Sequence, residues 1–110
     1  MPISTIDFEL VVLEHLAAKS DVSGIELREH VTKTSGRHIS LASFYQRMAN
    51  MEEAGYVEGY YKTQIIDNQE IKERTYNLSR HKGSNRINEI VRIRSRLGPE
   101  TGMEGGLAPA

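Results

Sequence analysis

A segment near the middle of the chain carries side chains that can hydrogen-bond to the edges of nucleic-acid bases. Between residues 40 and 54, Leu41, Phe44, Met48 and Met51 recur every three or four positions, which predicts a helix with one buried face. Arginine can bind guanine O6 and N7, glutamine and asparagine can pair with adenine, and serine can hold phosphate. The expected reading residues are Ser40, Ala42, Ser43, Gln46, Arg47 and Asn50.

Two earlier helices should support this one. Residues 5–19 have apolar side chains spaced by three or four, which predicts an amphipathic helix. Ser23 and Glu26 have the spacing of a capping box, so a second helix should begin at residue 24 and run to about residue 34. Gly36 can adopt the left-handed conformation that ends a helix.

The pattern after residue 55 is that of a β-hairpin. Tyrosine, valine and threonine accumulate over residues 56–64, and residues 70–79 alternate along an extended chain. The pair Asp67-Asn68 between them supplies turn residues. Three cations of this hairpin are candidates for contact with backbone phosphate: Lys62, Lys72 and Arg74.

A basic helix is expected over residues 84–97, stopped by Gly98-Pro99. Its apolar side can pack on the first helix of its own chain, or pair across a two-fold axis with a partner. The second arrangement is favoured, because two subunits reading a palindromic site gain affinity. The residues expected at that interface are Leu10, Leu13, Leu16, Ile87, Ile90, Val91 and Leu97.

The composition is that of a soluble domain. The chain has 110 residues, 38% of them hydrophobic, and a formal charge of −1, which suits one folded unit in the cytoplasm and no membrane span. The charge is segregated, because residues 1–71 carry 6 basic and 11 acidic side chains while residues 72–97 carry 8 and 2. A local basic segment can attract anions although the total is near zero.

The sequence gives little support for a metal site or for covalent catalysis. There is no cysteine, and no two of the four histidines are three or four residues apart, as paired ligands on a helix would be. No serine has a histidine and a carboxylate at a recognisable spacing. The chain is therefore expected to be no enzyme and to hold no cofactor and no metal.

The order helix, helix, helix, hairpin, helix predicts a winged helix-turn-helix. This is an α+β fold, mainly helical, in which the third helix enters the major groove and the hairpin, or wing, reaches the flanking backbone. Residues 1–83 would form the DNA-binding domain, residues 84–98 the short C-terminal helix that dimerises, and residues 99–110 a disordered tail.

Four segments resemble those of the PadR-like transcriptional regulators: residues 23–27 (SGIEL), 39–48 (ISLASFYQRM), 51–57 (MEEAGYV) and 74–79 (RTYNLS). The resemblance covers roughly residues 8–83, although residues 67–70 lack the usual glycine pair of the wing. It implies a dimeric repressor whose Tyr45 lies close to DNA; a partly buried tyrosine is the equal alternative.

Two other functions stay open. The acidic first 71 residues favour a winged-helix module that binds a protein and reads no DNA sequence. The other is a small-molecule sensor with a pocket between the dimer helices and an unidentified effector, which is compatible with DNA binding. Double-stranded DNA and a second copy of the chain are the expected partners, and the chain itself is expected to be a sequence-specific transcriptional regulator.

Overall fold

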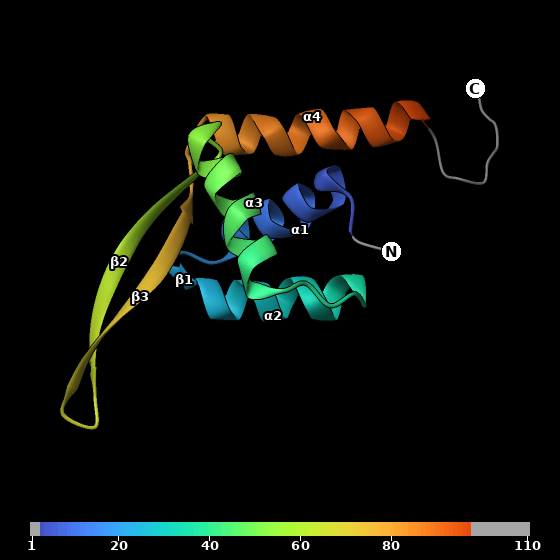
Figure 1. The fold of residues 1–110 in the computed structure, drawn as a ribbon. Coiled ribbons are helices and arrows are strands. Elements are labelled where there is room, and N and C mark those ends of the chain that lie inside the picture. The colour runs from blue at the N-terminus through green and yellow to red at the C-terminus, as the bar shows by residue number, and fades with distance from the viewer. Residues whose placement is uncertain (1–2, 98–110) are drawn as a thin grey trace.

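In the computed structural model, residues 3–97 are described, and they form the predicted winged helix (Figure 1). Strand β1 was not predicted, because two residues leave no periodic signal; it pairs with β3, so the sheet order is β1-β3-β2. The elements are α1 (Thr5–Ala18), β1 (Val22–Ser23), α2 (Gly24–Ser35), α3 (Leu41–Glu53), β2 (Val57–Ile66), β3 (Gln69–Leu78) and α4 (Lys82–Leu97).

Each of the first three helices begins at a serine cap. The hydroxyls of Ser4, Ser23 and Ser40 accept from backbone N–H groups three residues on, at 3.1, 3.1 and 3.2 Å. Such bonds satisfy N–H groups that a helix start otherwise leaves unpaired. Helix α2 ends at Gly36 in the left-handed conformation, with φ of 70°. The start and the end of α2 were therefore readable from the sequence.

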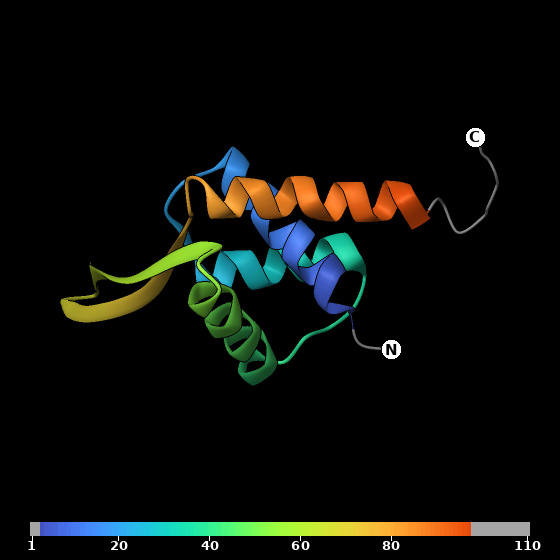
Figure 2. The ribbon, with the colours of Figure 1, turned by 90° about the horizontal axis from the view of Figure 1, so that it is seen from above.

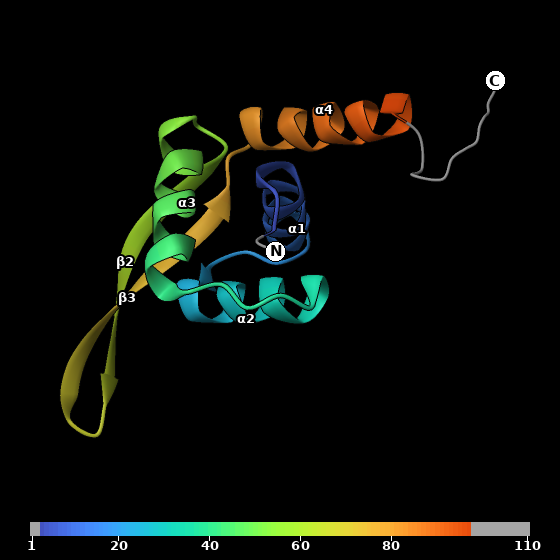
Figure 3. The same ribbon diagram turned by 45° about the vertical axis from the view of Figure 1, so that its right-hand side comes forward.

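Helix α1 lies at the centre of the molecule, between α4 on one side and α2 on the other (Figures 1 and 3). Helix α3 packs beside the base of the hairpin. Leu41 was expected in the core and is instead 50% exposed. It occupies the first position of α3, where a side chain leans back past the helix start and away from the core. Buried core residues include Phe8, Leu13, Leu27, Phe44, Met48 and Tyr76.

The hairpin has the expected turn. Asp67 and Asn68 both have positive φ, 52° and 62°, which is the type I′ geometry that suits the twist of two-residue hairpins. Opposite residues pair from Val57 with Leu78 to Ile66 with Gln69. We call residues 57–61 and 74–78 the proximal half of the hairpin, and residues 62–66 and 69–73 its distal half.

Helix α4 packs on α1 of the same chain (Figures 1 and 2). It begins at Lys82, two residues before the expected start. Arg86 Nε donates to Glu9 Oε1 at 2.7 Å, and Arg94 lies 3.0 Å from Asp7. Ile90 is fully buried against this layer. The structure therefore contains the first of the two placements considered for this helix.

Most of the apolar residues named for a dimer interface are used inside the chain. Leu10, Leu13 and Leu16 are buried, as is Ile90, and Ile87 is half-buried. Val91 is 46% exposed. The side chain of Leu97 and the tail expected over residues 99–110 lie outside the described residues. Over residues 3–97, none of the helices has the length and apolar character needed to span a bilayer.

Candidate nucleic-acid interface

The outer face of α3 is polar and exposed. Phe44, Met48 and Met51 bury the opposite side, so the helix is held firmly while its other face stays in solvent. Gln46 Nε2 donates to Asn50 Oδ1 at 3.2 Å, which aligns the two amides one helical turn apart. The exposed members of the predicted reading set are Ser40, Ala42, Ser43, Gln46 and Asn50.

Arg47 of that set, and Tyr45, which the family resemblance places close to DNA, lie partly against the protein. Arg47 is half-buried: its Nη1 lies 3.5 Å from the Ser4 carbonyl oxygen, and its guanidinium is 5.3 Å from the centre of the Phe8 ring. Tyr45 is also half-buried, and its ring covers Gly24, where a Cβ atom would come 2.5 Å from the hydroxyl. This burial raises the pKa of the Tyr45 hydroxyl.

The three wing cations do not share one surface. Lys72 is paired across the strands with Thr63 and Lys62 with Glu73. Because successive residues of a strand point to opposite faces, Lys72 and Lys62 lie on opposite sides of the wing. Arg74 shares the face of Lys72, and this face turns toward α3. Residues Tyr45, Ala49, Glu52, Tyr61, Lys72, Arg74 and Tyr76 line a groove of about 610 Å³ there.

The guanidinium of Arg74 contacts one carboxylate and two aromatic rings of the protein. Nη2 donates to Glu52 Oε2 of α3 at 2.6 Å, and the guanidinium lies over the rings of Tyr61 and Tyr76. The hydrogen bond that Arg74 donates to Glu52 raises the pKa of Arg74, and burial raises the pKa of Tyr76 to about 12. The wing base and the end of α3 are thereby joined by a charged contact.

The other face of the wing base is fastened to the loop before β1. Asp21, with φ of 54°, accepts hydrogen bonds from Tyr60 Oη and from Asn77 Nδ2, and its own N–H donates to Asn77 Oδ1 at 2.7 Å. The bond from Tyr60 is the main reason that the pKa of Asp21 is lowered. Side-chain contacts therefore hold the base of the hairpin on both of its faces.

Solved structures with this arrangement are numerous, although no protein-family model and no curated protein sequence matches the chain. A PadR-like transcriptional regulator from Bacillus cereus is 21% identical, with a TM-score of 0.64 over 81% of this chain and 82% of that one. A PadR family transcription regulator from Clostridium difficile is 19% identical, with a TM-score of 0.62 over 82% and 88%.

A third structure, of a Streptococcus mutans protein, is 21% identical and has a TM-score of 0.67 over 88% of this chain and 84% of that one. The chain has the fold of PadR-like regulators. The family resemblance of the four sequence segments thus agrees with the three-dimensional arrangement, over most of the length of each chain.

The tip of the wing carries acidic and apolar side chains. Residues 63–71 contain two carboxylates and no cation. Ile65, Ile66 and Ile71 are 76%, 47% and 40% exposed, so apolar surface surrounds the turn. Carboxylates are repelled by phosphate. Below the tip, Lys62 and Lys72 are exposed cations without an ion pair among residues 3–97.

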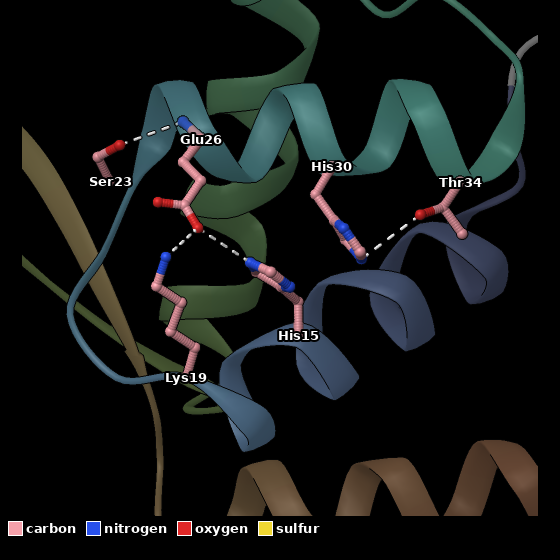
Figure 4. A network of polar contacts seen from close by, with 6 residues as sticks. All are labelled: His15, Lys19, Ser23, Glu26, His30 and Thr34. Carbon is pink, nitrogen blue, oxygen red and sulfur yellow. Dashed lines mark hydrogen bonds and ion pairs between the residues drawn. The ribbon is translucent and has the colours of Figure 1, made fainter.

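A cluster with two histidines, one from α1 and one from α2, links these two helices (Figure 4). The rings of His15 and His30 are stacked with centres 4.0 Å apart, and Glu26 Oε2 lies 3.3 Å from His15 Nε2 and 2.7 Å from Lys19 Nζ. The spacing of histidines within one helix could not reveal a histidine pair that forms between two helices. Among residues 3–97 no group of three or more histidines and carboxylates has the geometry of a metal site.

Sequence reasoning missed the anchors of the wing. Glu52 carried a usable signal, because a glutamate in the last turn of a helix opposes the helix dipole and so indicates a cationic partner elsewhere. Asp21 gave no comparable signal. Its partners are 39 and 56 residues away in the sequence, and only the packed sheet brings them together.

Proposed function

We propose that this chain is a sequence-specific DNA-binding regulator of transcription, with α3 in the major groove and the wing on the flanking backbone. The observation that carries the proposal is the firmly packed α3, whose exposed face presents Ser43, Gln46 and Asn50. The exposed cation Lys72 lies on the wing face that turns toward the same helix. Amides on such a helix suit direct readout of adenine. The PadR-like regulators among the solved structures with this fold support the same role.

The test is binding to fragments of the protein's own upstream region at several salt concentrations, with non-specific DNA as competitor. Competitor-resistant binding that weakens steeply with salt is expected. Gln46→Ala and Asn50→Ala should each remove about 1–3 kcal/mol of discrimination at their base position. Lys33→Met, which removes an exposed cation on α2, is the control and should leave discrimination unchanged.

The finer proposal is a dimeric repressor, which the family resemblance implies. On α4, Val91 is the exposed large apolar residue among those described, and it is flanked by Arg92. Val91→Glu should shift sedimentation from dimer to monomer if α4 contacts the partner. Ser84→Glu, at an exposed position of the same helix, is the matched control. An unchanged dimer in the Val91 variant would place the interface elsewhere.

A protein-binding module is the second candidate, and the acidic wing tip favours it. Exposed isoleucines with Asp67 and Glu70 suit a partner surface that is apolar and basic. If the wild-type chain is folded and shows no competitor-resistant DNA binding, this function takes first place. An Asp67→Lys, Glu70→Lys variant should then lose its partner.

A small-molecule effector also stays a proposal. The groove of about 610 Å³ between α3 and the wing falls within the usual size of ligand sites, about 300–1,000 Å³. A ligand bound there would contact α3 and Lys72 together, and so would compete with DNA. Titration of candidate ligands against the bound DNA fragment tests this directly.

A further inference from the structure

The side chains of Glu52 and Arg74 lie where α3 meets the wing. Nη2 and Oε2 are 2.6 Å apart, and the two side chains are 29% and 26% exposed. The guanidinium is 4.9 Å from the ring centre of Tyr61 and 5.8 Å from that of Tyr76. Two aromatic faces and one carboxylate therefore hold Arg74 in a single orientation, directed at α3.

Gly59 makes room for this contact. A Cβ atom at Gly59 would lie 2.8 Å from Arg74 Nη2 and 2.9 Å from Glu52 Oε2. Its φ is not in the left-handed region, so the backbone conformation does not require glycine here. Glycine is needed here for its missing side chain, because the ion pair crosses β2 at this position.

Lys72 presents the opposite case on the same face of the wing. It lies two residues from Arg74 along β3, and it is exposed. Within residues 3–97 no acidic side chain pairs with it. Its charge is available to an anion, whereas the charge of Arg74 is already compensated by Glu52.

We propose that Arg74 is a positioning residue, which with Glu52 sets the angle between α3 and the wing, while Lys72 supplies the phosphate contact from that face. The proposal rests on the DNA binding proposed above. It replaces the expectation that Arg74 itself binds phosphate. A rotation at the wing base moves Lys72 relative to the reading face of α3, so this ion pair controls whether both contact the same DNA site at once.

The salt dependence of DNA binding separates a phosphate contact from a positioning contact. Each phosphate contact contributes about 0.9 to the slope of log affinity against log salt concentration. Lys72→Met should therefore reduce the slope by about 0.9. Arg74→Met, which keeps an apolar side chain beside Tyr61 and Tyr76, should leave the slope unchanged and lower the ratio of specific to competitor binding.

Glu52→Gln provides the converse test. It removes the carboxylate that holds Arg74, so the guanidinium becomes free to contact a phosphate. The slope should then increase by about 0.9 while the specificity ratio falls. Glu53→Gln is the matched control, because Glu53 is the neighbouring, exposed carboxylate of α3 and removes the same charge. The difference between the two variants isolates the pairing with Arg74 from the general loss of a negative charge.

Two results would overturn the proposal: an Arg74→Met slope reduced as much as that of Lys72→Met, or identical slopes for Glu52→Gln and Glu53→Gln. Absence of competitor-resistant binding by the wild-type chain would instead contradict the proposed function. In that case a double-mutant cycle of Glu52→Gln and Arg74→Met in urea unfolding still tests the ion pair, and zero coupling would refute it.

Discussion

The proximal half of the hairpin is packed between α3 and the loop before β1, whereas the distal half extends beyond the helices (Figure 1). Thr75 and Tyr76 are buried in the proximal half, and every distal residue except Glu73 is exposed. Both halves have the same antiparallel ladder without interruption. Strand pairing therefore makes the hairpin, but side-chain contacts at its base decide where it points.

The difference also separates two kinds of chemistry. In the proximal half Arg74 pairs with Glu52, and Tyr60 and Asn77 donate to Asp21 of the loop before β1. In the distal half Lys72 carries an unpaired charge within the described residues. The proximal half fixes the orientation of the wing, and the distal half presents a free charge. This division can be tested by variants matched across the two halves.

The largest contrast should come from truncating one large side chain in each half. Tyr76→Ala removes a ring that is 2% exposed, and it should lower the free energy of unfolding by about 3–5 kcal/mol. Ile65→Ala, at a side chain that is 76% exposed, should change it by less than about 0.5 kcal/mol. Urea unfolding measures both. Equal losses would show that the distal half is packed in solution.

Gly83→Ala should come next in size. A Cβ atom at Gly83 would lie 2.5 Å from Leu78 Cδ1 and 2.6 Å from the Tyr56 carbonyl oxygen, where α4 starts against the wing base. Overpacking of this kind costs about 1–3 kcal/mol. Ser84→Ala, one residue on and exposed, is the control. A thermal midpoint unchanged in Gly83→Ala would mean that this contact is loose.

Mild acid should weaken the helical body and spare the wing. Burial, and then the charge of His15, lower the pKa of His30 from its ordinary 6.5. The unfolded chain then binds the proton more readily, so stability falls as pH drops below 6.5. Urea unfolding of wild type and His30→Gln, which should lose part of this slope, measures the effect.

Residues 57–78 contain no histidine, so acid in this range should not act on the hairpin directly. Amide exchange of the distal half, followed against pH and corrected for its intrinsic pH dependence, should stay constant while that of α2 increases. A parallel increase in both would mean that the wing and the body open together.

The smallest effect is expected at the turn. Asn68 has φ of 62°, which glycine adopts at no steric cost. Asn68→Gly should therefore raise the free energy of unfolding by no more than about 0.3 kcal/mol. Amide exchange should slow in the distal half and stay unchanged in the proximal half. Slower exchange throughout would contradict the independence of the two halves.

Much of the fold was predictable because its signals are local. The cap at Ser23, the glycine after α2 and the Asp67-Asn68 turn act on backbone within a few residues, and each was placed correctly. Leu41 was misplaced because periodicity does not tell where a helix leaves the core. The two-residue β1 is too short for any pattern.

The sequence by itself determined the order of the elements, the buried stripe of α3 and the polar types on its other face, because helix and strand periods are properties of consecutive residues. The tertiary structure alone decided that Arg74 pairs with Glu52, that Lys62 and Lys72 lie on opposite faces, and that α4 packs on its own α1. Those contacts join residues far apart in the chain, and their energies depend on distances that exist only after the core has packed.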